Sequence, residues 1–478
     1  MMVGFFMVPV DATAVVVANP SIMADLRTDH DAVMWVTSSY LLAYAVPLLV
    51  SGRLGDRFGP KGLYLAGVAL FTAASAWCGL ANSLGMLVAA RVFQGLGAAL
   101  LTPQIMSLIT RTCPPERRGA AQSIWGAAAA AATFVGPLVG GVLIDTLGWQ
   151  AIFWANIPIG VAALALAVRL VPELPARQQQ IGLVSVGLSG AAIFLIVFAL
   201  QEAPDNAWAP WVWLMMITGL GLGAAFFWRQ SFEPGAALVP LGIFRDRAFT
   251  FCCAGVLVTA FVTTAMVVPT MFYTQAVCGL SSLQSGLVIA PIPVIGGLLA
   301  PTVGRVVDRF PPQWVIGGGF ALLTVGLVWL STDMSPATPM WRIVGAYCAI
   351  GVGLAFLWIP LAANSARNLP AVQAGAGSGI YNAAQQLGAV LGSASLSAVM
   401  SSLISSAVPT ATAGSEAVTR VAEPMREALA SALAQSLLLP ASVAACGVVG
   451  IAFMVRRPTA SIDLRTTDSS TTGVLLPT

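Results

Sequence analysis

The sequence predicts an all-α polytopic membrane protein with 14 transmembrane helices and both termini in the cytoplasm, on three observations. The 478-residue chain is 58% hydrophobic and only 9% charged, whereas soluble domains carry roughly a quarter charged residues. Apolar runs of about 20 residues, the length that spans a bilayer, recur along the chain. The loops between them differ strongly in their content of Lys and Arg, which sets the orientation of the spans.

The runs are uniformly apolar rather than alternating, which favours helices over the strands of a barrel. The first six lie at residues 2–22, 32–52, 62–80, 84–109, 120–144 and 151–170. Two more follow at 183–201 and 209–228. The last six lie at 249–277, 282–306, 314–331, 340–362, 375–404 and 433–455.

Basic residues orient these spans. With the N-terminus inside, 17 Lys and Arg residues fall in the inner loops or the C-terminal tail, and four fall in the outer loops. An even number of spans returns the C-terminus to the cytoplasm. We therefore expect a multi-pass protein of the cell membrane.

A charged turn occurs twice. Residues 52–60 are GRLGDRFGP, and residues 304–312 are GRVVDRFPP, at an offset of 252 residues. The copies follow the second and the tenth span, so the chain is duplicated with its units eight helices apart. Two six-helix halves alone would place them six apart, so two helices are inserted.

The predicted domains are an N-terminal six-helix bundle at 1–172, the inserted helices at 173–247, a C-terminal six-helix bundle at 248–457 and a disordered tail at 458–478.

Four local patterns lie in order on the N-terminal spans. They are DATAVVVANP from Asp11, GRLGDRFGPK from Gly52, RVFQGLGAA from Arg91 and GPLVGG from Gly136. Together they resemble the motifs of the major facilitator superfamily, specifically its 14-helix drug:proton antiporter branch. The resemblance implies a transporter that uses the proton gradient without a cofactor, and neither an enzyme nor a metal protein.

Asp11 and Arg91 are an acid and a base within predicted spans. Intramembrane charges are costly and usually functional, so Asp11 suits a group that binds and releases a proton. The resemblance implies that Arg91 takes part in proton coupling. The alternative is structural: a polar contact between helices, with Arg91 paired to helix carbonyls or to Asp11. The equivalent of Arg91 in the second half is Tyr347, so we expect proton handling in the N-terminal half.

The first copy of the charged turn is the expected cytoplasmic gate. Asp56 can bond basic groups or the free N–H groups of a helix N-terminus, and the resemblance implies that it closes the inner side. The alternative is that the basic residues only fix topology. The expected gate residues are Gly52, Arg53, Gly55, Asp56, Arg57, Gly59 and Lys61, with Asp308 and Arg309 as a weaker second gate.

The fifth span contains Gly136, Pro137, Gly140 and Gly141. Proline kinks a helix, and glycines let a neighbouring helix pack closely. The resemblance implies that this bent helix packs against the opposite half and controls opening. The alternative is ordinary packing of small residues.

Polar and aromatic residues within spans are candidates for a substrate cavity. For each of them the alternative is an interfacial belt residue or an interhelical hydrogen bond. The candidates are Tyr40, Gln94, Trp125, Asn156, Tyr273, Tyr381, Asn382 and Gln385.

The leading hypothesis is a monomeric secondary transporter that exports amphiphilic organic compounds in exchange for protons. Its partners are then a small organic substrate, protons and the lipid bilayer. Nucleic acid is excluded as a partner because no basic run interleaves with aromatic residues. One alternative is a dedicated exporter of one metabolite, lipid or siderophore on the same fold. A membrane sensor or a channel is the other, although the sequence shows no repeated polar filter.

Overall fold

The computed structural model describes residues 1–28, 30–114, 117–174, 182–203, 206, 208–232, 237–407 and 423–454. Within these ranges the regular structure is helical, with no strand. Thirteen helices are long and apolar enough to cross a membrane, and one bent pair brings the count to 14. The predicted all-α fold and its span count are confirmed. The predicted tail at 458–478 lies outside the described residues.

The described residues of the N-terminal half form seven helices. They are α1 (Met2–Leu26), α2 (His30–Ala45), α3 (Leu48–Phe58), α4 (Pro60–Gly79), α5 (Leu84–Thr112), α6 (Arg118–Leu147) and α7 (Gln150–Leu170). The second predicted span is the bent pair, because α2 and α3 meet at an angle of 46°. Pro47 lies at this break and has no N–H to continue the helical hydrogen bonds.

The C-terminal half begins with α10 (Arg247–Phe272), which ends in a π-helical turn, η3 (Tyr273–Val277). The spans that follow are α11 (Ser282–Ile289) with α12 (Pro291–Arg309), α13 (Pro312–Asp333) and α14 (Met340–Ser365). After the short η4 (Ala371–Gln373) come α15 (Ala374–Ala407), α16 (Glu423–Ser436) and α17 (Leu438–Met454).

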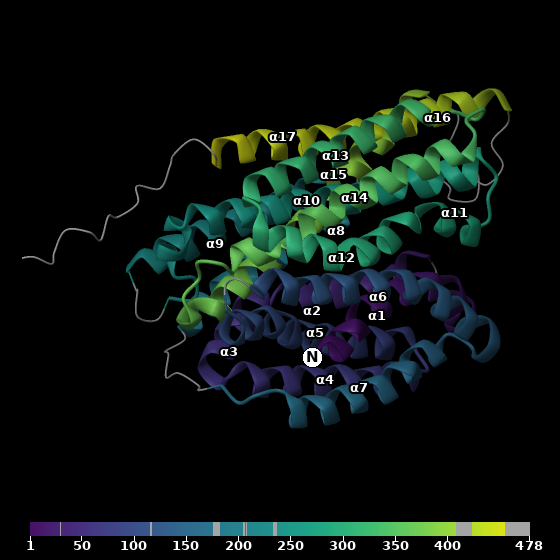
Figure 1. The fold of residues 1–478 in the computed structure, drawn as a ribbon. Helices are drawn as coiled ribbons and strands as arrows, with labels where there is room; N and C mark the ends of the chain where they lie inside the picture. Colours follow the sequence, from purple (N-terminus) through teal and green to yellow (C-terminus); the bar gives the residue numbers. More distant parts are fainter. Residues whose placement is uncertain are drawn as a thin grey trace, which may run out of the picture.

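The two halves lie side by side, with α1–α7 in purple and blue below the green and yellow C-terminal helices (Figure 1). Their interface, here called the seam, is formed where α6 packs on α12 and α14, and where α3 and α5 pack on α15. The inserted helices α8 (Leu183–Glu202) and α9 (Pro210–Phe232) pair with each other. Because α8 contacts both α2 and α15, the insert touches both halves.

The duplication is visible in the packing of equivalent helix pairs. A Cβ atom at Gly67 of α4 would lie 2.9 Å from the carbonyl oxygen of Gly97 on α5. At the equivalent place, a Cβ atom at Gly319 of α13 would lie 3.1 Å from the carbonyl oxygen of Gly353 on α14. Glycines allow backbones to approach this closely, which is how helices associate where lipid removes the hydrophobic driving force. Each half therefore keeps the same glycine-to-glycine crossing.

Candidate functional site

Asp11 and Arg91 meet inside the N-terminal half. Nη1 of Arg91 donates to Oδ2 of Asp11, and both side chains are completely buried. Nε of Arg91 donates to the carbonyl oxygen of Val36 at 3.0 Å. The guanidinium also lies 4.1 Å from the centre of the Tyr40 ring, within the range of a cation–π contact. The acid of α1 and the base of α5 are thus each other's partner.

The second oxygen of the carboxylate is held by two amides. Oδ1 of Asp11 accepts from Nε2 of Gln94 and from Nδ2 of Asn156, each at 2.9 Å. Both amides also donate to Oγ of Ser75, at 2.7 and 3.3 Å. Helices α1, α5 and α7 therefore meet at one carboxylate, and Ser75 of α4 bonds the two amides beside it. Hydrogen bonds of this kind offset the cost of burying an ion pair.

Three residues expected to line a substrate cavity lie in this network instead. Gln94 and Asn156 bond the carboxylate, and Tyr40 covers the guanidinium. Ser75 was not predicted, because a serine in a run of small residues carries no distinguishing signal. Gln94 did carry one, since its position three residues after Arg91 places both on one face of a helix.

The glycines of α6 pack beside the same carboxylate. Gly136 contacts Val10 and Thr13 of α1, and Gly140 contacts Ala14. These glycine contacts lie within the N-terminal half, whereas α6 as a whole also packs on α12 and α14 of the opposite half, as expected of this helix. Nothing lies within 4 Å of a Cβ atom built at Gly141. A different part of α6, which includes Ser123 and Ala130, packs on α12 across the seam. Pro137 is within α6.

Asp56 joins the two halves at the cytoplasmic end. Its completely buried carboxylate accepts from the backbone N–H groups of Gly375 at 2.9 Å and Ala376 at 3.0 Å. These residues form the first turn of α15, where N–H groups lack helical partners and the helix dipole favours an anion. Arg111 of α5 forms an ion pair with the same carboxylate. Nη1 of Arg53 lies 3.9 Å from it.

Further hydrogen bonds close the cytoplasmic end of the seam. Arg118 at the start of α6 donates to the carbonyl oxygens of Ala366 and Arg367, which follow α14. Oγ of Ser378 on α15 donates to the carbonyl oxygen of Pro103 on α5 at 2.6 Å. Together with Asp56, these contacts describe a molecule closed on its cytoplasmic side.

Arg53 reaches the segment that follows the inserted helices. Its guanidinium donates to the carbonyl oxygens of Ala237 and Leu238, the latter at 3.1 Å. This segment is buried, and the N–H of Val239 donates to the side chain of Gln230 on α9 at 3.2 Å. The gate residue thus connects α3 to the linker between α9 and α10.

The remaining predicted gate residues differ in their contacts. Gly59 has φ +89°, the left-handed region that favours glycine, and lets α3 turn directly into α4. Gly52 contacts Gly375 across the seam, and Gly55 contacts Gln104.

Lys61 does not contribute to the seam through its described contacts. Its Nζ donates to the carbonyl oxygen of Val168 on α7 at 3.0 Å and lies 3.7 Å from Glu173. Arg57 and Arg309 are exposed. The side chain of Asp308 lies outside the described part of the chain.

The other cavity candidates are divided between the seam and the C-terminal half. Trp125 packs against the buried clusters of both halves. The hydroxyl of Tyr273 donates to the carbonyl oxygen of Ser335 at 2.8 Å, away from the seam. Asn382 donates to the carbonyl oxygen of Ser378 on its own helix at 2.8 Å. Tyr381 is buried and Gln385 half-buried, both on α15.

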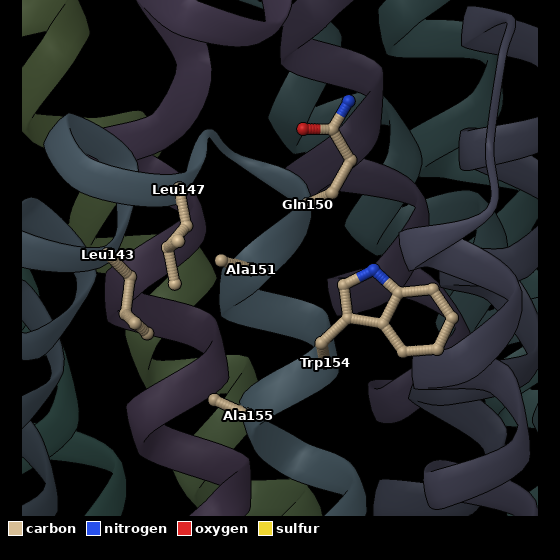
Figure 2. Close-up of a pocket in the computed structure, with 6 residues that line it drawn as sticks. All are labelled: Leu143, Leu147, Gln150, Ala151, Trp154 and Ala155. Carbon is tan, nitrogen blue, oxygen red and sulfur yellow. The ribbon is translucent and has the colours of Figure 1, made fainter.

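A pocket of about 380 Å³ lies between α6 and α7. Figure 2 shows its lining, with Leu143 and Leu147 on one side and Trp154 on the other. Leu147 and Trp154 are exposed on the outside of the half. None of the predicted substrate residues lines this pocket. Among the described residues no three His, Cys, Asp or Glu side chains group as metal ligands.

Comparison with known proteins places these features in a family. The family model of the Major Facilitator Superfamily matches residues 1–393. An uncharacterised MFS-type transporter of Mycobacterium tuberculosis is 50% identical over 395 residues, which are 83% of this chain and 68% of that protein. The tetracenomycin C resistance and export protein of Streptomyces glaucescens is 33% identical over 82% of this chain and 73% of its own length.

Two further similarities bear on function and fold. The multidrug resistance protein Stp of Mycobacterium tuberculosis is 32% identical over 82% of this chain and 73% of its own length. The crystal structure of the human organic anion transporter MFSD10 superposes with a TM-score of 0.65 at 12% identity, covering 93% of this chain and 97% of that chain. At that identity the likeness concerns the fold alone.

Proposed function

This chain belongs to the major facilitator superfamily, and we propose that it is a secondary transporter that exports amphiphilic drug-like compounds in exchange for protons. Substrate and proton take turns as the two halves rock about the seam. The relatives named for resistance and export support the direction and the substrate class. The observation that carries proton coupling is the buried Asp11–Arg91 pair.

The pair suits proton exchange because its two states differ by one charge. Ionised Asp11 balances Arg91 in an interior where an unpaired charge is costly. A proton on the carboxylate removes that balance and weakens the contact between α1 and α5. Because Gly136 and Gly140 of α6 pack against the same turns of α1, a shift of α1 reaches a helix that also packs across the seam.

The closed cytoplasmic end supports alternating access. Asp56 binds the N-terminus of α15 from the other half, so this contact must break before the cytoplasmic side opens. We propose the described state as the outward-facing one, ready to release substrate and take up a proton. Asp56 and Arg111 then act as the latch of the inner gate.

Flux into inverted membrane vesicles tests this function. A fluorescent lipophilic cation should accumulate when a proton gradient is imposed and leak out when the gradient is collapsed. Asp11→Asn should give vesicles that no longer respond to the gradient. Accumulation that stays the same when the gradient is collapsed, and in Asp11→Asn, would contradict proton-coupled export.

A dedicated exporter of one compound is the second candidate, because one relative is named for a single antibiotic, tetracenomycin C. A panel of amphiphilic cations, neutral compounds and weak acids in the same vesicles separates the two. Multidrug export predicts that several classes are transported and compete. A dedicated exporter predicts that one class is transported and the others neither move nor compete.

A further inference from the structure

We propose that Asn156 and Ser75 are positioning residues that direct the transported proton to Oδ2 of Asp11, the oxygen that pairs with Arg91. The inference rests on the proposed proton coupling at Asp11. It adds two residues, on α7 and α4, that are not part of the four sequence patterns. It also assigns different tasks to the two oxygens of one carboxylate.

The two oxygens of Asp11 have different surroundings. Oδ1 accepts two amide N–H groups at 2.9 Å, which uses the acceptor sites of one carboxylate oxygen. Oδ2 accepts only from Arg91 among the described contacts. A proton therefore binds at Oδ2, where it competes with Arg91 for the charge of the carboxylate. Protonation and the ion pair become alternatives at a single atom.

Ser75 sets the spacing of the two amides. Its Oγ accepts from Nε2 of Gln94 at 2.7 Å and from Nδ2 of Asn156 at 3.3 Å. Each amide nitrogen has two N–H groups, so one is directed to the hydroxyl and the other to the carboxylate. The serine oxygen is completely buried, and it fixes both amides on the same oxygen of Asp11.

The neighbours of Asp11 leave few other groups that could take the proton. The titratable or charged groups that interact electrostatically with it are Arg91 of α5, Tyr40 of α2 and Cys78 of α4. In the described contacts α6 presents Gly136, and α7 presents Asn156, neither of which titrates. Among the titratable groups here, Asp11 is the one whose carboxylate accepts from Arg91, Gln94 and Asn156.

Removing the Asn156 amide should make Asp11 easier to protonate. The amide stabilises the ionised carboxylate, so Asn156→Leu favours the protonated form and moves the midpoint of the pH–transport profile upward. Loss of a hydrogen bond to a charge corresponds to about tenfold in proton affinity, or about one pH unit. Ser75→Ala should move the midpoint in the same direction by roughly half as much, because its oxygen touches the amides and not the carboxylate.

The experiment measures gradient-driven accumulation of the lipophilic cation across a pH series in inverted vesicles. Two matched controls remove buried polar groups whose described side-chain hydrogen bonds stay within their own helices. They are Asn364→Leu, whose amide donates to the carbonyl oxygen of Pro360 at 2.8 Å, and Thr72→Val, whose hydroxyl donates to that of Val68 at 2.7 Å. The controls should keep the wild-type midpoint.

An unchanged midpoint in Asn156→Leu, or an equal shift in Asn364→Leu, overturns the positioning role. If Asn156→Leu does not reach the membrane, the milder Ser75→Ala decides: an upward shift supports the role, and none overturns it. Asp11→Asn separates the two levels of inference. If that variant still responds to the gradient, proton coupling at Asp11 and the positioning role both fail. If it is inactive while the Asn156→Leu midpoint is unchanged, only the positioning role fails.

Discussion

In the two halves, equivalent pairs of helices are joined by different kinds of side-chain contact. In the N-terminal half α1 and α5 are joined by the charged pair Asp11–Arg91. In the C-terminal half the equivalent helices α10 and α14 are joined by a hydrogen bond from the hydroxyl of Tyr347 to Thr270. Tyr347 stands where the duplication would place Arg91. The Asp11–Arg91 contact can bind a proton at its carboxylate, whereas the Tyr347–Thr270 contact has no carboxylate. We therefore assign proton exchange to the N-terminal half alone.

The two copies of the charged turn differ in a similar way. Both place a glycine against the facing helix of the other half: Gly52 contacts Gly375 on α15, and Gly304 contacts Ser123 on α6. The charges diverge, because Arg53 is 8% exposed and bonded, whereas Arg305 is exposed. Backbone packing has been kept in both copies, and the ionic contacts of the first have no described counterpart at Arg305 and Arg309.

The largest effect is expected from removing the charge of Asp11, which pairs with Arg91 where α1 meets α5. Asp11→Asn should abolish gradient-driven accumulation, because the site can no longer exchange a proton. The matched change in the second half, Thr270→Val, should leave the response to the gradient in place. Both are compared by transport in inverted vesicles at equal protein content. A loss of coupling in Thr270→Val would show that the halves share the proton-handling task.

A smaller effect is expected at the latch. Asp56→Ala removes two backbone hydrogen bonds and the partner of Arg111, so the cytoplasmic side should open more often, by about tenfold for one lost charge-assisted contact. The labelling rate of Ser107→Cys reports this, because Ser107 is completely buried on α5. Ser107→Cys is introduced into a variant in which the seven native cysteines have been replaced, so that the label reacts only at position 107. Arg309→Ala, in the second copy, should leave the rate unchanged.

A few-fold effect is expected from Arg53→Lys. Lysine keeps the charge but lacks the planar guanidinium that reaches two carbonyl oxygens together. Labelling of Ser107→Cys should rise a few-fold as the linker after α9 is released. Arg305→Lys is the control, because Arg305 is exposed. Equal rates in the two variants would mean that the linker does not hold the gate.

The smallest effect is expected from Tyr347→Phe. The change removes one neutral hydrogen bond, which within membranes costs about 0.6 kcal/mol on average. Thermal unfolding in detergent should show a slight loss of stability, while the midpoint of the pH–transport profile stays in place. A shifted midpoint would contradict the assignment of proton exchange to the first half.

The sequence predicted what depends on length and charge. Fourteen spans follow from the thickness of a bilayer. The interpretation of α8 and α9 as additional to two six-helix sets, which rests on the offset between the charged turns, stays a prediction. Asp11 and Arg91 could be selected because charges are rare inside spans. Their direct pairing was one of the alternatives left open, and it is the arrangement found.

The sequence could not predict which side of an apolar helix faces its neighbours. Asn156 was expected to face substrate, but α7 is apolar around most of its surface, so no stripe marks the side that meets Asp11. Lys61 could equally reach the other half or α7, since its position at a helix start fixes only its depth. The contact of Arg53 with Ala237 joins residues 184 apart in the chain, and no local pattern signals a partner that is a backbone carbonyl.

The contact between Arg53 and the linker after α9 bears on how such chains can be shortened. Excision of the whole predicted insert at 173–247 would leave every motif in place, yet it would remove the carbonyl acceptors of a buried guanidinium, Ala237 and Leu238. A 12-helix derivative would then need either a new acceptor at that position or a smaller, uncharged residue in place of Arg53. The linker after α9 therefore contributes the acceptors that hold the gate residue Arg53 in place.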